Sequence, residues 1–291
     1  GFYRNRYEVA GVGIDVCCWF FYFSGFTNST IPSLNLFMNL SSIGVQSYCF
    51  RGFKTIPELI EQVQSMGVKS IELCGVHVDF SNEASFASVI EKFKDAEIDI
   101  SSVGVISLNK DGQAPNSAFQ FAKAAGAQFV SINLPPDITD EGLEQAAQTA
   151  NEFGVRLAIH NHGGRHWLGS KQHLGHILSR ASQEIGLCLD TAWALDAGEN
   201  PVAMATAFAD RLYGVHIKDF VFDRARKHED VIIGTGNLDL PAFFEELQKG
   251  GFSGYAVIEY EGDINNPVPA LRECVAELKK HASAAPAEAV A

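Results

Sequence analysis

Imidazole and charged side chains follow several short apolar runs in this chain. They occur in the sequences LAIHNHGG, CLDTAW, YGVHIKD and AVIEYEG, which contain His160, His162, Asp190, His216, Lys218, Glu259 and Glu261. A charged residue inside an apolar strand is costly to bury unless it is paired or bound to a metal ion. One cation could satisfy several of these groups together if the runs end at the same level of one fold.

We therefore expect His160, Asp190, His216 and Glu259 to hold one divalent metal ion. A mixed set of imidazole and carboxylate ligands suits zinc, manganese or cobalt better than calcium. Magnesium is a further candidate, so the expected ion is zinc, manganese, cobalt or magnesium.

Three residues near these ligands are candidates for catalysis. His162 shares a strand face with His160 and is a candidate acid or base, because an unperturbed imidazole titrates near neutral pH. Lys218 could stabilise an enolate oxygen or bind a substrate. Glu259 could act as a base in addition to being a ligand.

Two further residues are candidates for substrate binding, each with a structural alternative. Glu72, a charge within the segment SIELCG, could hydrogen-bond the hydroxyl groups of a substrate or pair with Lys218 or an arginine. Trp193 could stack on the ring of a substrate or simply pack in the core.

The metal hypothesis also has structural alternatives. Asp190 could cap the helix that follows it. His216 and Lys218 could form ordinary ion pairs with Asp219 or Glu259. A shared metal site is favoured over these separate alternatives, because the four proposed ligands fall on consecutive predicted strands at matching depth.

The elements that must position these residues follow a repeating pattern of strand and helix. The predicted strands span residues 43–48, 70–74, 99–106, 128–134, 156–161, 186–190, 213–218 and 256–260. Their starts recur at roughly 27–31 residues, with about 43 before the last, which is the length of a strand–helix unit. The strands are nearly continuous apolar runs, as in parallel sheets covered on both faces.

Local signals support the intervening helices. Thr55 precedes Pro57 and Glu58, a typical helix start, while Gly126 and Gly154 stand where helices would end before strands. No glycine-rich phosphate-binding motif follows a strand. The pattern therefore predicts an α/β fold, a single-domain (β/α)8 TIM barrel over residues 41–281, with its chemistry at the carboxyl ends of the strands.

The flanking segments do not fit this pattern. Residues 1–40 are expected to be an irregular or non-native extension, although a signal or anchor segment is an alternative. Their apolar run at 16–26 is shorter than the about 20 residues of a membrane span. Residues 282–291 are expected to form a flexible tail.

Composition excludes some classes of function. The formal net charge of −13 argues against nucleic-acid binding, which needs a basic surface. Six cysteines without a Cys-x-x-Cys pair favour reduced thiols in a cytoplasmic protein. No membrane partner is expected.

Several of these segments resemble one known family. YGVHIKD, followed by GTGNLDLPAFFEEL and AVIEYEG, is similar to the sugar phosphate isomerase/epimerase family of xylose isomerase-like TIM barrels, and CLDTAWALDAGENP resembles the sixth-strand segment of that family. The resemblance extends over residues 43–279. It implies a metal-dependent isomerase or epimerase that acts on a sugar or keto-sugar. It also implies that the barrel could form a homodimer.

At the site, this chain departs from the family pattern at two positions. Ketose 3-epimerases of this family hold their metal with Glu, Asp, His and Glu, and these positions match His160, Asp190, His216 and Glu259. A histidine thus replaces the first glutamate, and Trp193 stands where a histidine is common. The His-x-His and His-x-Lys-Asp patterns also resemble inosose dehydratase, so a lyase acting on a cyclitol is one alternative. A sugar-binding barrel without catalysis is another.

Overall fold

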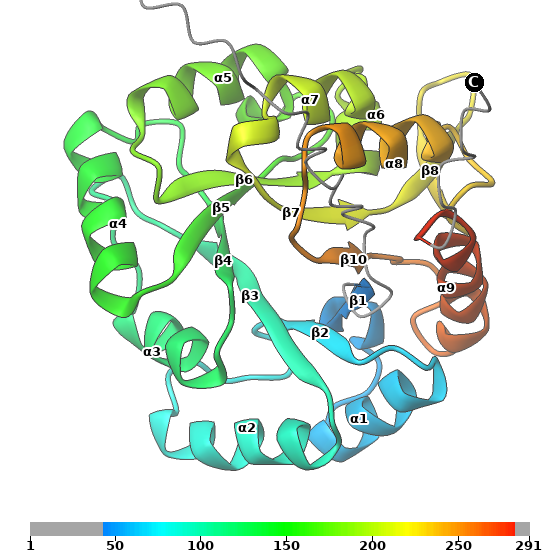
Figure 1. Ribbon diagram of the computed structural model, residues 1–291, viewed down its shortest axis with the longest axis horizontal. Coiled ribbons are helices and arrows are strands. Elements are labelled where there is room, and N and C mark those ends of the chain that lie inside the picture. The colour runs from blue at the N-terminus through cyan, green and yellow to red at the C-terminus, as the bar shows by residue number, and fades with distance from the viewer. Residues whose placement is uncertain (1–42, 283–291) are drawn as a thin grey trace, which may run out of the picture. The chain divides into compact units, whose positions relative to one another are not determined.

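The computed structural model describes residues 43–282, which form a closed barrel of eight parallel strands surrounded by helices (Figure 1). The order around the barrel is β1-β10-β7-β6-β5-β4-β3-β2. The strands are β1 Ile43–Gln46, β2 Ser70–Leu73, β3 Asp99–Ser107, β4 Phe129–Asn133, β5 Arg156–His160, β6 Ile185–Asp190, β7 Leu212–Ile217 and β10 Ala256–Ile258. The predicted TIM barrel is confirmed, and each predicted strand overlaps one of these.

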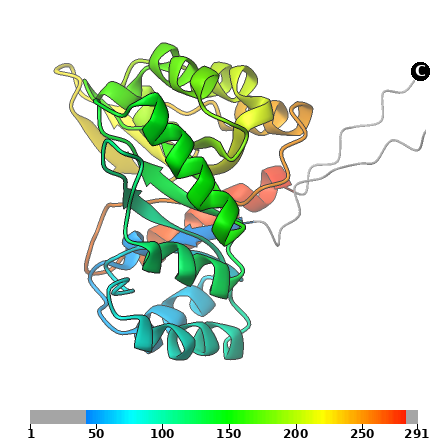
Figure 2. The same ribbon diagram turned by 90° about the vertical axis from the view of Figure 1, so that its left-hand side faces the viewer.

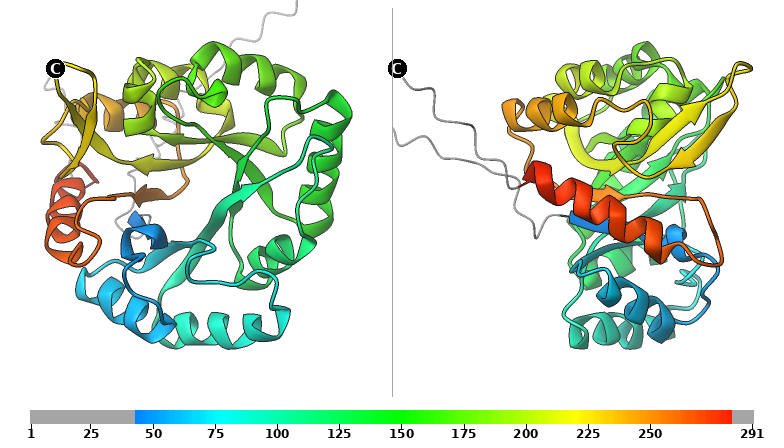
Figure 3. Two further views of the ribbon diagram at one scale, coloured as in Figure 1. Left: turned by 180° about the vertical axis from the view of Figure 1, so that it is seen from behind. Right: turned by 90° about the vertical axis from the view of Figure 1, so that its right-hand side faces the viewer.

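The helices form an outer ring around the strands, as Figure 1 and the left view of Figure 3 show. They are α1 Ile56–Ser65, α2 Phe86–Asp95, α3 Asn116–Ala125, α4 Asp140–Phe153, α5 Lys171–Arg180, α6 Thr191–Asp196, α7 Pro201–Ala207, α8 Leu240–Lys249 and α9 Val268–Ala282. The expected caps are present: Thr55 and Glu58 form a capping box at α1. Gly126 and Gly154 end α3 and α4 in the left-handed conformation, with φ of 73° and 68°.

One pair of strands was not predicted. β8 Asp219–Phe222 and β9 His228–Val231 form an antiparallel hairpin between β7 and α8, within the long interval before the last barrel strand. Figure 2 and the right view of Figure 3 show this hairpin, in yellow, extending from one end of the barrel. The sequence does not reveal it, because only Lys218 separates β8 from the end of β7, and no glycine or proline marks the boundary.

Phe129 fills part of the barrel interior. Its ring packs in a buried cluster with Ala158, Cys188 and Tyr213, which lie on β5, β6 and β7. A Cβ added to Gly214 on β7 would overlap the Phe129 ring. Because β4 and β7 are not neighbours, this contact crosses the barrel interior, and Gly214 is the residue that leaves room for it.

The remaining expectations concern the termini, the thiols and membranes. The predicted extension over 1–40 and the tail, apart from the helical residue 282, lie outside the described residues. Cys49, Cys74, Cys188 and Cys274 are free and buried, as expected for reduced thiols. Within residues 43–282, no helix has both the length and the apolar character needed to cross a membrane.

We predict that Gly214→Ala destabilises the barrel by about 1–3 kcal/mol, because an extra methyl group must displace the buried Phe129 ring. Denaturant unfolding measures the difference. Gly175→Ala is the matched control: its Cβ would meet Phe208 at an ordinary 3.7 Å, and alanine is favoured by about 0.5–1 kcal/mol within a helix. Equal stability of the two variants would contradict the assignment.

Candidate active site

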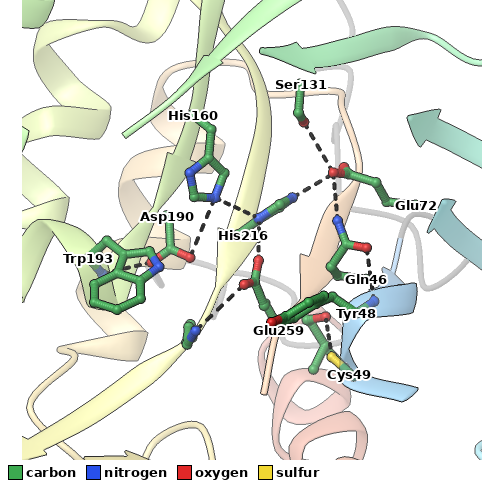
Figure 4. A network of polar contacts seen from close by, with 12 residues as sticks. Gln46, Tyr48, Cys49, Glu72, Ser131, His160, Asp190, Trp193, His216 and Glu259 are labelled. Carbon is green, nitrogen blue, oxygen red and sulfur yellow. Dashed lines mark hydrogen bonds and ion pairs between the residues drawn. The ribbon is translucent and has the colours of Figure 1, made fainter. Parts of the chain in front are cut away.

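Four polar side chains converge inside the carboxyl end of the barrel (Figure 4). They are His160 at the end of β5, Asp190 at the end of β6, His216 on β7 and Glu259 directly after β10. One ligand atom from each lies within 4.8 Å of the others. The barrel register explains the convergence, because Asp190 is paired with His216, and His216 with Val257, two residues before Glu259.

The distances within the cluster are short. His216 Nδ1 lies 2.6 Å from Glu259 Oε2 and 3.1 Å from His160 Nε2. His160 Nε2 lies 3.8 Å from Asp190 Oδ2. All four residues are buried. The arrangement brings together the four ligands that the sequence analysis named.

The chemistry of this donor set fits a divalent metal ion. Asp190 Oδ2 is buried and has no hydrogen-bond partner in the structure, although an unpaired buried carboxylate oxygen is costly. Two imidazole nitrogens and two carboxylate oxygens are a ligand set suited to zinc, manganese or cobalt. The cluster can therefore hold one such ion, bound by His160, Asp190, His216 and Glu259.

Asp190 also serves the alternative role that the sequence allowed. Its Oδ1 accepts a hydrogen bond of 2.7 Å from the backbone N–H of Trp193 and caps α6. Its Oδ2 turns into the cluster. One oxygen of the carboxylate forms the cap and the other faces the cluster, so the cap does not argue against a ligand role.

Burial shifts the protonation of the cluster. It raises the pKa of Asp190 to about 7, with a further contribution from the charge of Glu259. It lowers the pKa of His160 well below the ordinary value. Burial alone would raise the pKa of Glu259, but Lys218 and His216 lower it well below its usual range. Burial would lower the pKa of His216, but its neighbours raise it well above the ordinary value. A bound cation would therefore replace protons held within this cluster.

Lys218 lies beside the cluster among three carboxylates. Its Nζ forms an ion pair with Glu261 and lies 3.5 Å from Glu259 Oε1 and 3.8 Å from Asp230 Oδ1. The ammonium also lies 4.9 Å from the centre of the Trp193 ring. Lys218 is only 1% exposed, and its contacts link β7, β9 and the end of β10.

Asp219 is not a partner of Lys218 or His216, so that part of the ion-pair alternative is wrong. Its carboxylate accepts backbone hydrogen bonds of 3.0, 2.9 and 2.9 Å from Gly234, Gly236 and Leu238. A short strand-end aspartate can cap a nearby loop in this way, and here it fixes the segment between the hairpin and α8.

A cavity of about 410 Å³ opens beside the cluster and is lined by residues that include Tyr48, His162, Trp193, Glu259 and Glu261. Its volume lies within the range of small-molecule sites. His162 Nε2 is buried and unpartnered, and burial lowers the pKa of this residue to about 4. The prediction from sequence took the ordinary pKa of imidazole, near neutrality. Burial instead leaves His162 neutral at pH 7, in the form that can accept a proton.

Trp193 forms one wall of this cavity. Its ring has edge contacts with Phe220 and His228, at 5.1 and 5.0 Å between ring centres, while Lys218 lies over it. Trp193 is thus held by packing and also lines the cavity, so the packing role is present and stacking on a substrate stays a prediction.

Glu72 lies deeper than the cavity and is completely buried. Its carboxylate lies 3.2 Å from His216 Nε2 and also accepts hydrogen bonds from Gln46, Ser102 and Ser131. The predicted alternative of a pair with Lys218 or an arginine is therefore wrong, and the partner is His216.

Sequence reasoning missed three residues of the site. Gln46 ends β1 and contacts Glu72, Tyr48 lines the cavity, and Asp230 reaches Lys218 from β9. Gln46 carried a usable signal, since it is a polar residue that ends an apolar strand. Asp230 carried none, because the hairpin that positions it was not foreseen.

Sequence comparison identifies the family. A model of the family described as "Xylose isomerase-like TIM barrel" matches residues 60–281. The match covers most of the chain, so the protein belongs to the xylose isomerase-like TIM barrel family.

Individual relatives are more distant. The rhizopine catabolism protein MocC of Rhizobium meliloti is 31% identical over 141 residues, which are 44% of this chain and 43% of that protein. An inosose dehydratase of Lacticaseibacillus casei is 24% identical over 150 residues, 44% of this chain and 50% of that enzyme. The aligned parts span about half the length of these curated relatives.

Solved structures share the fold. The 3-keto-D-glucoside 4-epimerase YcjR of E. coli has a TM-score of 0.62 and 18% identity, covering 82% of this chain and 98% of that one. A D-tagatose 3-epimerase-like protein has a TM-score of 0.66 and 16% identity, covering 82% and 96%. At these identities the likeness concerns the barrel alone.

We expect Asp190→Asn and Asp190→Ala to differ in stability but not in metal binding. Both remove the charged oxygen that faces His160, so both should abolish tight binding of Mn²⁺ or Zn²⁺ in a chelator competition assay. The amide can still cap α6, whereas alanine loses the cap at a cost of about 0.5–2 kcal/mol.

The matched control is Asn200→Ala, which removes the cap of α7 outside the cluster. It should lose similar stability and bind metal as the wild type does. Unchanged metal affinity in Asp190→Asn would rule out a ligand role for this carboxylate.

Proposed function

We propose that this protein is a divalent-metal-dependent lyase that removes water from a keto-sugar or keto-cyclitol. The observation that carries this proposal is the convergence of His160, Asp190, His216 and Glu259 within 4.8 Å beside a cavity that also exposes His162. A divalent ion in this cluster would polarise a substrate carbonyl and acidify the adjacent C–H group.

Within this proposal, the residues of the chain supply the proton transfer and the binding surface. His162 lines the cavity, is neutral at pH 7 and has an Nε2 without a partner, so it can accept the proton from carbon and return it to the hydroxyl group that leaves the neighbouring carbon as water. Glu259 stays a carboxylate because Lys218 and His216 surround it, and it acts as a ligand and second candidate base. Trp193 provides an apolar wall for the substrate.

Lys218 has a supporting role in this scheme. Three carboxylates and the face of Trp193 surround its ammonium group, and the residue does not line the cavity. We assign it the task of holding Glu259 and Glu261 in place as carboxylates.

The histidine at position 160 supports elimination of water over epimerisation. Epimerisation needs proton-transferring groups on both faces of the reacting carbon. In the related ketose epimerases a glutamate at this position serves that purpose, and here burial keeps His160 neutral within the ligand cluster. Similarity to inosose dehydratases also favours this reaction.

A sugar isomerase or epimerase is the second candidate. Glu259 and His162 line the same cavity, so two groups able to hold a proton reach one substrate. This pair would suffice for epimerisation if the two groups act from opposite sides of the ring.

The activity test uses the full chain with inosose and related keto-sugars. We expect a metal-dependent product that absorbs in the ultraviolet, as an unsaturated diketone does, and loss of activity after treatment with a chelator. His162→Ala should lower kcat by about 10²–10⁴-fold, the usual contribution of a positioned acid or base. His176→Ala, on the exposed surface of α5, is the control and should keep full activity.

Other outcomes separate the alternatives. Deuterium incorporation from solvent with an epimeric product and no ultraviolet absorption would replace the lyase by the epimerase. Tight binding with neither product nor exchange would indicate a sugar-binding barrel. Full activity in metal-free protein would refute both catalytic proposals.

A further inference from the structure

Glu72 is the centre of a buried hydrogen-bond network that joins five barrel strands (Figure 4). Its Oε1 accepts from Gln46 Nε2 at 2.8 Å and from Ser131 Oγ at 3.2 Å. Its Oε2 accepts from Ser102 Oγ at 2.6 Å and lies 3.2 Å from His216 Nε2. These partners come from β1, β4, β3 and β7, and Glu72 itself lies on β2.

The orientation of the Gln46 amide is fixed independently of Glu72. Its Oε1 accepts from the backbone N–H of Tyr48 at 3.1 Å and from Ser47 Oγ at 3.3 Å. The amide oxygen is therefore occupied, and the NH₂ group must face Glu72. Glu72 is in this way held as an acceptor and not as a donor.

This arrangement assigns a proton to Nε2 of His216. Both oxygens of Glu72 already accept from protein donors, so the contact with His216 is a hydrogen bond only if Nε2 donates. Nδ1 is the nitrogen that faces His160 and Glu259, so it is the atom available to a cation bound in the cluster once the proton shared with Glu259 is displaced.

We propose that Glu72 is a positioning residue that keeps a proton on His216 Nε2 and so presents Nδ1 to the metal ion. The inference rests on the proposed metal-dependent function and extends it to a residue outside the ligand cluster. A carboxylate behind a ligand histidine fixes the ring and its tautomer, and loss of such a partner lowers metal affinity by about 10–100-fold.

A purely structural role is the competing explanation, because the network also joins strands. That role predicts lower stability in a Glu72 variant but unchanged properties of His216. Metal affinity and the position of the ring proton therefore distinguish the two explanations, while thermal stability alone does not.

The first experiment compares E72Q with Glu97→Gln, an exposed glutamate paired with Lys69 far from the cluster. The amide introduced by E72Q has one acceptor oxygen in place of two, and its NH₂ group would face other donors. We expect the affinity of folded E72Q for Zn²⁺, measured by competition with a chromophoric chelator, to fall by about 10–100-fold. The Glu97→Gln protein should bind like the wild type, and wild-type affinity in E72Q would overturn the proposal.

The second experiment needs no variant of Glu72 to fold. In metal-free wild-type protein with ¹⁵N-labelled histidine, NMR should show a hydrogen on His216 Nε2, with the signal assigned through its loss in His216→Asn. An Nε2 without a proton would overturn the proposal. If the wild type binds no divalent metal, the proposed function fails, whereas the Nε2 proton is still expected from the contact with Glu72.

Discussion

The burial of ionisable side chains at one end of the barrel is the constraint on which the rest of the site depends. Glu72, Asp190, His216 and Lys218 are at most 1% exposed, yet each carries or can carry charge. Such groups are tolerated only when paired, hydrogen-bonded or bound to a metal. The surrounding strands meet this requirement with small donors such as Ser102, with further carboxylates, and with a ligand set able to share one cation.

The candidate ligands and the network around Glu72 come from different strands of the barrel. β5, β6, β7 and the end of β10 supply the candidate ligands, whereas β1 to β4 supply the network around Glu72. The β8–β9 hairpin adds a third contribution, because Asp230 approaches Lys218 and also accepts a hydrogen bond from the backbone of Glu261. The candidate ligands and their neighbours are therefore contacted by elements that contribute no candidate ligand.

The family accommodates dehydratases and epimerases on one barrel, and proton transfer separates the two reactions. Both begin by removing a proton beside a carbonyl, and they differ in the group that acts next. In this chain His160 and His162 both line the cavity, and Nε2 of His162 is buried without a hydrogen-bond partner. The identity of two residues at the end of β5 thus bears more directly on the reaction than the fold does.

The sequence by itself determined the barrel, its eight strands and the four residues whose ligand atoms converge, because strand alternation fixes which side chains face inward. Only the tertiary structure decided how the inward residues pair. Glu72 and His216 are 144 positions apart, and their contact depends on barrel closure. The capping of α6 by the same carboxylate that faces His160, and the lowered pKa of His162, likewise depend on burial and distance. A one-dimensional pattern specifies the face of a strand, but the neighbour across the barrel is set by closure and register, which no local sequence encodes.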